Sequence, residues 1–553
     1  MSSIFINALA ANIGVLSHLL YFKRGEHHMH GVLYLQVFLL LNGAAVFALS
    51  RLAGYEIPQA FSVVSSASFF YLLSVNGSAL LYRAFFHPLR NFPGPFMARL
   101  SNFWWPTRVT TNADAPYKLE KLHEKYGQFL RIGPNTLSII HPDGPQKVYG
   151  LGTKCSKGPW YDQDYPLTSL HTSRKRDMHD QRRKIWSPAF SDKALRGYEE
   201  RMKPYENRLV EQLRAFGGVQ PVNVSDWFNY FSYDVMGDLA FGESFDMLEK
   251  GEEHWAIALL NAGMEPMAAK LPPWVFRVIV AIPGAAKDYW KFINYCSEQM
   301  QKRMEASAKI PDITSALLEP FQEKGSLREP EGLELTYLQG DSRLVIVAGS
   351  DTTAATLTHL FYHLAAEPSL VQRLRRELKP YTDSEGNVEN SDIANNDYLN
   401  GCIFETLRLH PPVPSAINRS TPPEGIEIGS KHIPGNADVF CPQYVIGRSD
   451  ICYKDPQGFV PERWYEKTNM VTNRTAFSPF SQGVYGCIGR PLAMLEIRTT
   501  VAKLLHYFDV DFAPGEDGRD LLYKTRDHFT LGLAPLKLRF NERKERRDSA
   551  APA

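Results

Sequence analysis

The chain has 553 residues, with 61 lysine and arginine residues against 60 aspartate and glutamate residues. This balance argues against a nucleic-acid-binding protein, which would carry an excess of basic residues. Apolar residues make up 44% of the chain and charged residues 22%, an ordinary globular composition that can build a large core. The six cysteines are dispersed and form no closely spaced pair, which argues against a zinc site and a disulfide framework.

The first 86 residues contain apolar stretches at 4–22, 32–50 and 61–82 that carry no charged residue. A helix needs about 20 apolar residues to cross a bilayer. The first stretch is weaker, because Asn7, Asn12 and His18 interrupt it. These patterns predict a membrane anchor of one to three transmembrane helices over residues 1–86.

Basic residues predict the orientation of this anchor. Lys23 and Arg24 follow the first stretch, Arg83 and Arg90 follow the third, and Arg51 stands between the second and third. Cytoplasmic flanks are enriched in such residues, so three crossings would place the N-terminus outside and the rest of the chain in the cytoplasm. The alternative is a single crossing, with the other stretches lying in the membrane interface.

The remainder of the chain predicts a mainly α fold with small β-sheets. Prolines make residues 87–95 a stiff connector to a body over residues 96–540. The charged segment 541–553 is predicted to be disordered. Amphipathic helical patterns cover 197–216, 288–308, 336–366, 368–378 and 489–507, and strand-like runs lie near 129–140, 426–435 and 437–442.

The stretch FSQGVYGCIGR, residues 480–490, places Cys487 among glycines and directly before a helical pattern. The N-terminus of a helix favours an anionic sulfur, because unpaired N–H groups point at it. Such a thiolate suits a nucleophile, a ligand of a soft metal ion, or the single axial ligand of haem iron. The residues of this stretch alone leave these alternatives open.

Phe480, Gly483, Cys487 and Gly489 match in register the haem-binding loop of the cytochrome P-450 monooxygenases, which this stretch resembles. The resemblance implies the cytochrome P-450 fold, haem b as the cofactor, and Cys487 as the axial ligand of its iron. Tyr485 stands where that family usually has arginine or histidine. A neutral hydroxyl there would weaken one charge-assisted bond to a haem propionate by about 1–2 kcal/mol.

A second motif, ETLRLHPP, carries Glu405 and Arg408 three residues apart on one helical face. By itself it predicts a surface ion pair worth less than ~1 kcal/mol. It is similar to the Glu-x-x-Arg helix of the family, whose partner stretch is matched by FVPERW with Arg463. The resemblance implies that Glu405, Arg408 and Arg463 form a buried structural network.

A third motif, AGSDTTAATL, interrupts a helix with polar residues at 350–353. Adjacent Asp351, Thr352 and Thr353 weaken a helix locally, and a bend or a cap is the alternative interpretation of the stretch. The stretch resembles the oxygen-activation segment of the family. On that resemblance Thr352 would position dioxygen and an ordered water, Asp351 would relay protons, and Ala348 and Gly349 would leave room for oxygen and substrate.

A fourth motif, HDQRRKIWSPAFS, places His179 and Arg183 four residues apart. It resembles the helix of the family that reaches the haem propionates, and Arg419 is a further candidate for that role. Because Tyr485 is neutral, these residues would have to balance more of the negative charge of the propionates. Arg182 and Lys184 are expected on a solvated basic face that could dock an acidic electron donor.

The resemblance implies a haem-thiolate monooxygenase, an oxidoreductase that inserts one atom of O2 into an apolar small molecule. The sequence looks most like fungal microsomal members of specialised-metabolite pathways, which implies an indole alkaloid or diketopiperazine, a terpenoid or a polyketide as substrate. The implied partners are NADPH-cytochrome P-450 reductase, cytochrome b5 and membrane lipid, at the endoplasmic reticulum. The pocket walls are expected at the 156–178 loop, the 254–285 region, Val413, Ala416 and Phe529.

Three alternatives remain from the sequence. A non-oxygenating haem-thiolate isomerase or dehydratase would often lack the acid–threonine pair, so Asp351 and Thr352 argue against it. A membrane haem-binding protein without turnover belongs to another class and would bind haem without consuming oxygen. A transporter is disfavoured, because about 460 residues follow the apolar stretches without another long apolar run.

Overall fold

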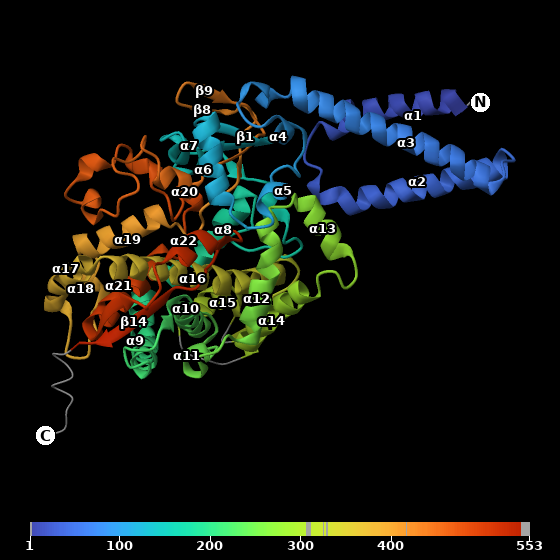
Figure 1. The fold of residues 1–553 in the computed structure, drawn as a ribbon. Helices are drawn as coiled ribbons and strands as arrows, with labels where there is room; N and C mark the ends of the chain where they lie inside the picture. Colours follow the sequence, from blue (N-terminus) through green and yellow to red (C-terminus); the bar gives the residue numbers. More distant parts are fainter. Residues whose placement is uncertain (1–2, 306–310, 324–325, 328–329, 416, 544–553) are drawn as a thin grey trace.

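A three-helix projection extends from a large helical body in the computed structural model (Figure 1). The structure describes residues 3–305, 311–323, 326–327, 330–415 and 417–543. Most of the predicted tail, 544–553, lies outside the described residues. The prediction that disorder begins at 541 is wrong for its first residues, because Asn541 and Glu542 pair with a neighbouring strand.

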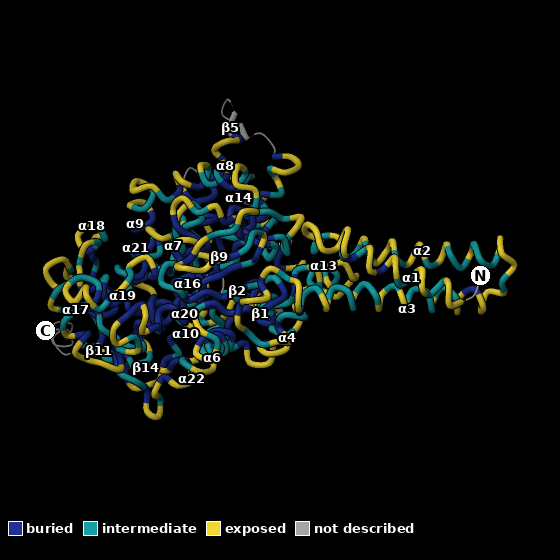
Figure 2. The backbone as a smooth tube through the Cα atoms, turned by 90° about the horizontal axis from the view of Figure 1, so that it is seen from above, coloured by how far each residue is buried: buried dark blue, intermediate teal, exposed yellow. Residues whose placement is uncertain are grey.

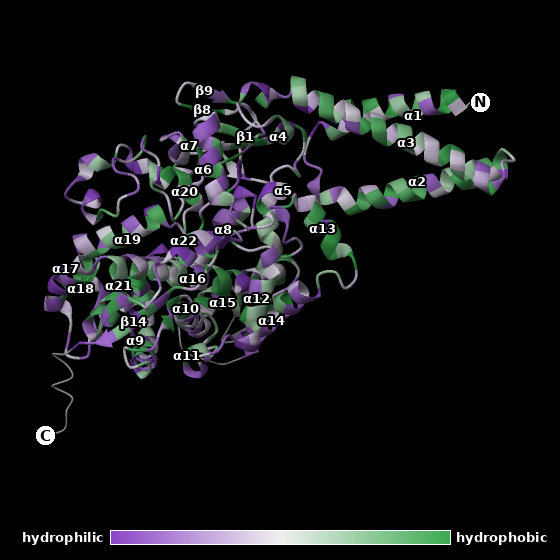
Figure 3. Ribbon diagram, viewed as in Figure 1, coloured by the Kyte–Doolittle hydropathy of each residue, from purple (hydrophilic) through white to green (hydrophobic). Residues whose placement is uncertain are grey.

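The projection consists of α1 (Ser3–Ser17), α2 (Gly31–Leu52) and α3 (Ile57–Leu81), and short π-helical turns extend α1 and α3. The segments Ser3–Phe22, His28–Leu52 and Ile57–Phe86 are each long and apolar enough to cross a membrane. Their side chains are mostly apolar and lie largely outside any protein core (Figures 2 and 3). The chain therefore carries N-terminal helices suited to membrane anchoring.

Polar residues of the first helix face the third helix. Ser66 Oγ donates to Asn7 Oδ1 at 3.2 Å, and His18 Nδ1 lies 2.8 Å from Ser78 Oγ. At Gly14 an added Cβ would lie 2.5 Å from a backbone oxygen of α3, so only glycine permits this close approach. Two of the three polar residues that weaken the first stretch as a sequence signal, Asn7 and His18, are thus helix–helix contacts, whereas Asn12 donates to the Ala8 carbonyl within α1.

A fourth apolar helix, α16 (Leu333–Ala366), is a core helix. It has the length and hydropathy of a membrane span, but 67% of its most apolar window is buried inside the body. It packs along α10 (Val224–Phe241), whose C-terminus is closed by Gly242 in the left-handed conformation, with φ of 77°. The polar segment 350–353 therefore lies in the middle of the body.

Helices dominate the body, which confirms the predicted fold class. The five predicted helical patterns correspond to α9, α14, α16, α17 and α21. Besides α10 and α16, the α-helices of the described body are α4 (Phe96–Leu100), α5 (Pro106–Val109), α6 (Ala115–Tyr126), α7 (Gly144–Tyr149), α8 (Arg176–Trp186), α9 (Asp192–Ala215), α11 (Met247–Lys250), α12 (Trp255–Met264), α13 (Pro273–Ala281), α14 (Lys287–Glu305), α15 (Ile313–Leu318), α17 (Pro368–Leu378), α18 (Asn390–Ile393), α19 (Asp397–Leu409), α20 (Gln443–Gly447), α21 (Arg490–Tyr507) and α22 (Arg519–Lys524).

The sheets are small. A five-stranded sheet has the order β1-β2-β10-β7-β3, in which β2 and β10 are parallel with Leu137 opposite Val439 and the other pairs are antiparallel. The strands are β1 (Phe129–Gly133), β2 (Thr136–Ile139), β3 (Ser156–Lys157), β4 (Val222–Asn223), β5 (Gln322–Glu323), β6 (Ser326–Leu327), β7 (Arg419–Ser420), β8 (Ile426–Ile428), β9 (Lys431–Ile433), β10 (Asp438–Phe440), β11 (Phe508–Phe512), β12 (Arg526–Asp527), β13 (Leu531–Gly532) and β14 (Lys537–Glu542).

Two hydrophobic cores hold the body. The larger one is built around α9, α10, α16, α19 and α21, and the smaller one covers the five-stranded sheet. The β3–β7 edge of that sheet faces the larger core through the loop 156–178, part of which lines the cavity described below.

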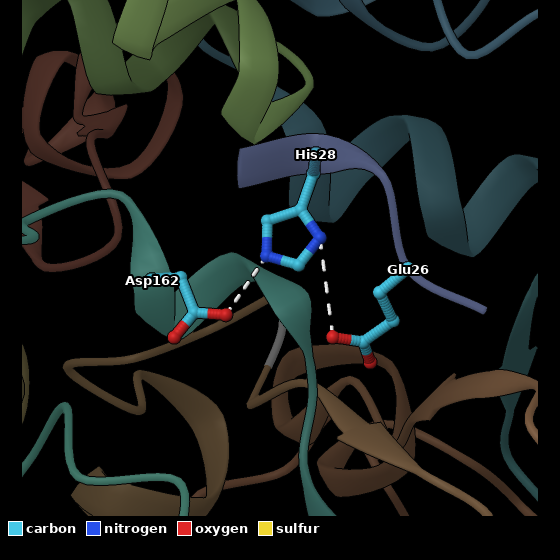
Figure 4. A group of neighbouring side chains, drawn as sticks. All are labelled: Glu26, His28 and Asp162. Carbon is cyan, nitrogen blue, oxygen red and sulfur yellow. Dashed lines mark hydrogen bonds and ion pairs between the residues drawn. The ribbon is translucent and has the colours of Figure 1, made fainter. Parts of the chain in front are cut away.

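Ionic contacts join the anchor to this loop. His28, in the connection between α1 and α2, places Nε2 at 2.8 Å from Asp162 Oδ2 (Figure 4). Glu26 lies on the other side of His28, and its carboxylate accepts two N–H groups of Arg174, at 2.7 and 2.8 Å. Arg174 also donates to Asp162. We call these four residues the anchor latch. Because both carboxylates share the Arg174 guanidinium and contact His28, the cluster is an ion-pair network.

Candidate active site

A cavity lies between α16 and the loop that leads into α21. Ala348, Thr352 and Thr356 line it on the α16 side, and Phe480 and Cys487 line it on the loop side. Further walls come from the loop 156–178, α8, α12, the segment 412–419 and the segment 529–530, and α10, α13 and α14 contribute one or two residues each. The tertiary fold thus brings together residues from all parts of the body.

Cys487 faces this cavity. Its backbone N–H donates to the Phe480 carbonyl at 2.8 Å, and Gly489 directly precedes α21. The Cys487 side chain is exposed to the cavity, but its enclosure by the surrounding body raises the pKa of the thiol, although the N–H groups of Gly489 and Arg490 and the charge of Arg183 act in the opposite direction. The helix N-terminus alone therefore does not produce a thiolate, whereas a coordinating metal ion would deprotonate the sulfur.

Gly483 is required by the backbone of the loop. It has a φ of 62°, and an added Cβ would lie 2.7 Å from the carbonyl oxygens of Tyr149 and Gly150. Both the conformation and the contact exclude a larger residue. The loop before Cys487 is thereby pressed against the end of α7.

Thr352 lines the cavity, whereas Asp351 lies on another side of α16. The Thr352 hydroxyl donates to the Ala348 carbonyl at 2.9 Å. Asp351 accepts hydrogen bonds from the Tyr233 hydroxyl at 2.5 Å and from the Thr530 hydroxyl at 3.1 Å, and Thr530 also lines the cavity. Withdrawal from water raises the pKa of Asp351. The Asp351 carboxyl is thus linked to the cavity through Thr530.

The room expected next to Ala348 and Gly349 is only partly present. Both residues line the cavity, but an added Cβ at Gly349 would lie 2.6 Å from Met236 Sδ. Met236 belongs to α10, so Gly349 serves the close packing of α10 against α16. The open space lies on the Ala348 side.

Predicted cationic residues gather on one wall of the cavity. Arg183 donates to the Gly486 carbonyl at 2.8 Å, and Arg419 donates to the Tyr161 hydroxyl at 2.9 Å. His179 lies beside them and contacts Asp180 at 3.0 Å. Burial and the charge of Lys157 lower the pKa of His179 to about 4, so its imidazole is neutral at pH 7.

Lys157 also belongs to this wall, although no sequence motif predicts it. It is 4% exposed and donates to the carbonyls of Leu170 and His171 at 2.9 and 2.6 Å. Burial lowers its pKa well below the ordinary lysine value. A single lysine in a loop matches no pattern, and only the fold brings it to the cavity.

The Tyr485 ring lies among these charges. Lys157 Nζ and the Arg419 guanidinium each lie 5.0 Å from its centroid, and the His179 ring packs edge-on at 4.6 Å. An aromatic face attracts cations electrostatically. Tyr485 therefore acts as a platform that the cations contact, where a second arginine would repel them.

The wall fits the two propionates of haem b. Within the described part of the chain, Lys157, Arg183 and Arg419 bond only to carbonyl and hydroxyl oxygens and to no carboxylate. The buried Arg419 Nε has no partner there. Buried cations are costly without a counter-charge, and two carboxylates of a cofactor would supply it.

A buried carboxyl group, Glu496 of α21, is a second residue that the sequence analysis missed. It lines the cavity and accepts a hydrogen bond from Ser232 at 3.1 Å. Burial and the nearby Glu206 raise its pKa to about 8, so it is largely protonated at pH 7. It therefore adds little negative charge to the cavity.

Arg182 is not on the solvated basic face expected for it. It is buried, and its Nε donates at 2.5 Å to Asp341, which also accepts the Trp186 indole N–H at 2.9 Å. The pair ties α8 to α16. Lys184 is exposed, as expected for that face.

The Glu405 side chain is the centre of a buried charge network, shared with Arg408 and Arg463. Both of its oxygens accept from Arg408, at 2.7 and 2.9 Å, and one accepts from Arg463 at 2.8 Å. The Trp464 indole N–H and the Val460 amide complete the shell at 3.0 and 2.9 Å. The arginines also bond to backbone carbonyls of segment 447–458, so the network joins α19 to that segment.

The expected pocket residues Val413 and Phe529 line the cavity, and Ala416 lies outside the described residues. Phe529 has a φ of 95°, which is rare for a bulky residue. Its ring stacks on Trp160 with centroids 4.7 Å apart. Trp160 and Phe529 make this wall apolar and aromatic.

Comparison with known families gives a match over most of the body. The sequence model of the cytochrome P-450 family matches residues 93–540. The solved structure of the cytochrome P-450DA haem domain shares the fold, with a TM-score of 0.66 at 19% identity over 78% of this chain and 94% of that one.

Several curated relatives match nearly the whole chain. The cytochrome P-450 monooxygenase notG' of Aspergillus versicolor is 44% identical, covering 94% of this chain and 95% of its own. Tryprostatin B 6-hydroxylase of Aspergillus fumigatus is also 44% identical, covering 95% of this chain and 94% of its own. The monooxygenase lcsK of Purpureocillium lilacinum is 41% identical, covering 96% of this chain and 97% of its own.

We expect Glu405→Leu to lower the stability of the body strongly. The change leaves two buried guanidinium groups without their counter-charge, which costs about 3–5 kcal/mol. Thermal unfolding of the detergent-solubilised protein measures the effect. The control is Glu377→Leu, which removes a partly exposed partner of Arg373 and should cost less than ~1 kcal/mol; equal losses in the two variants would contradict the assigned role.

We expect Lys157→Met to release haem b about tenfold faster or more, because one charge-assisted hydrogen bond to a propionate is lost. Tyr485→Phe keeps the aromatic face and should change the rate less than about threefold. Transfer of haem to excess apomyoglobin measures the rates, and the exposed Lys154→Met is the control. A larger effect for Tyr485→Phe than for Lys157→Met would show that the hydroxyl holds the cofactor.

Proposed function

The chain belongs to the cytochrome P-450 family of haem b monooxygenases, and from that premise we propose that it hydroxylates an indole alkaloid of the diketopiperazine type. The observation that carries this proposal is 44% identity to tryprostatin B 6-hydroxylase over 95% of this chain. The aromatic wall formed by Trp160 and Phe529 suits a flat apolar ring.

We propose Cys487 as the axial ligand of the iron, with Phe480, Gly483 and Gly489 shaping its loop. Lys157, Arg183, Arg419 and the neutral His179 would hold the propionate side, on the platform of Tyr485. Bound haem supplies the activation of O2, and a thiolate ligand favours cleavage of the O–O bond. The residues of the chain position the haem and the substrate, balance the charge of the propionates and exclude water from the cavity.

Thr352 and Asp351 are proposed to deliver protons. The Thr352 hydroxyl faces the cavity and can hold a water molecule there. Burial raises the pKa of Asp351, and its carboxyl contacts the cavity through Thr530, which suits a group that takes up a proton and passes it on. This pair disfavours the isomerase and dehydratase alternative.

We propose that the three anchor helices all cross the membrane of the endoplasmic reticulum. The connection between α1 and α2 lies next to the body, and the turn between α2 and α3 lies at the far end of the anchor (Figure 1). Lys23 and Arg24 belong to the first connection, and Arg51 to the last turn of α2. The positive-inside rule then places the body in the cytoplasm. There NADPH-cytochrome P-450 reductase, with cytochrome b5 as a further donor, would dock on a basic surface that includes Lys184.

Coexpression with the reductase tests the proposed function. Microsomes given tryprostatin B, NADPH and O2 should yield a product heavier by one oxygen atom in mass spectrometry. Cys487→Ala should abolish the product and the thiolate-type Soret band of the reduced, carbon-monoxide-treated protein. Thr352→Ala should keep that band but consume NADPH with little product.

Thr358→Ala is the matched control for Thr352→Ala. Its hydroxyl makes the same kind of contact within α16, to the Ala354 carbonyl at 2.8 Å, but it is buried away from the cavity. This variant should couple NADPH to product as the unmodified protein does. A full thiolate band without oxidation of any indole alkaloid would refute the proposed substrate class.

A further inference from the structure

Arg343 of α16 and Asp164 of the loop 156–178 form an ion pair. The pair lies where the first half of α16 lines the cavity. Arg343 donates to Asp164, and both residues line the cavity. Their side chains are 23% and 10% exposed, although they lie inside the body. Some of their polar surface therefore remains accessible from the cavity.

Apolar side chains share the cavity with this pair, among them Leu344, Val347, Met264 and Phe276. Burial raises the pKa of Tyr289, and the charge of nearby Asp164 adds to the rise. In a mainly apolar pocket, a polar pair determines how a ligand is oriented, whereas the apolar walls supply most of the affinity.

The distance from this pair to the proposed oxidation site follows from the helix. Arg343 and Thr352 are nine residues apart on α16. At 1.5 Å per residue they are about 13.5 Å apart along the helix axis. Nine residues are about two and a half turns, so the two side chains leave the helix on opposite sides, and it is the cavity that both of them line. A ligand that reaches both carries its polar group remote from the carbon that is oxidised.

We propose that the Arg343–Asp164 pair recognises an uncharged secondary amide of the substrate, at the end remote from the oxidised carbon. This proposal rests on the proposed function and names the substrate feature that the site selects. The amide carbonyl would accept from Arg343, and the amide N–H would donate to Asp164.

The charges of the pair favour a neutral ligand. An anionic ligand would be attracted by Arg343 but repelled by Asp164, and a cationic ligand would meet the reverse. Arg343 has five N–H donors, and its hydrogen bond to the described residues is the one to Asp164. An amide matches a neighbouring donor and acceptor without adding a net charge.

Asp164 is held in place from outside the cavity. Arg277 of α13 donates to the Tyr165 carbonyl at 3.1 Å, and Asp162 belongs to the anchor latch. The loop is thus fixed on both sides of Asp164 by residues that do not line the cavity. Such support keeps a recognition group in position before a ligand binds.

Spectral titration of the haem-loaded full chain tests the proposal. The probes are the cyclic dipeptide of tryptophan and proline and its amide N-methyl derivative, which keeps the carbonyls and loses the N–H donor. The unmodified protein should bind the first at least about tenfold more tightly, because methylation removes a hydrogen bond to a charged acceptor.

The double variant R343L/D164L should bind the two probes within about threefold of each other. It removes both charges together, so no unpaired buried charge is left to unfold the body. The control R201L/D238L removes a pair of similar exposure, 18% for each residue, that does not line the cavity, and should keep the preference. D164N serves as a milder variant that should reduce the preference.

Equal binding of the two probes by the unmodified protein would overturn the proposal. An undiminished preference in R343L/D164L with full haem content would also overturn it. These outcomes are separate from failure of the proposed function, which is read from the oxidation products of indole alkaloids.

Discussion

The body of this protein buries charges, and a buried charge requires an opposite charge or a full set of hydrogen bonds. Glu405 meets this requirement within the chain, because Arg408, Arg463, the Trp464 indole and a backbone amide all donate to it. The network fixes α19 against the segment 447–458. Lys157 and Arg419 are equally buried but face the cavity without a carboxylate from the described residues. The same physical rule therefore produces a rigid scaffold in one place and a cofactor site in another.

Helix α16 relates the two ends of the cavity. Its middle carries Thr352 opposite the loop of Cys487, and its first half carries Arg343. Two packing contacts hold the helix in place: Gly349 lets Met236 of α10 approach, and Asp341 receives Arg182 and Trp186 of α8. Because one rigid element carries both ends, the separation between the polar pair and the oxidation site is set by helix geometry.

The anchor contributes more than attachment to a membrane. The connection between α1 and α2 lies beside the body, where the anchor latch holds Asp162 (Figure 4). The neighbouring residues Trp160, Tyr161 and Asp164 line the cavity. The residue that anchors the loop and the residues that face a substrate are thus only one or two positions apart, so the anchor supports one wall of the cavity.

The sequence by itself determined the family, the mainly helical fold, the anchor segments and the motifs around Cys487, Thr352 and Glu405. The family rests on the resemblance of these motifs, and the fold class and the anchor segments rest on periodicity and apolar length, which are local properties of the chain. Apart from the network of Glu405, only the tertiary structure decided which charges are buried together. Lys157 meets Tyr485 and Arg419, Arg182 meets Asp341, and Asn7 meets Ser66, all between segments that no local pattern connects. The role of a charged or polar residue depends on the partner that the fold brings within a few ångströms, and that partner is remote in the sequence.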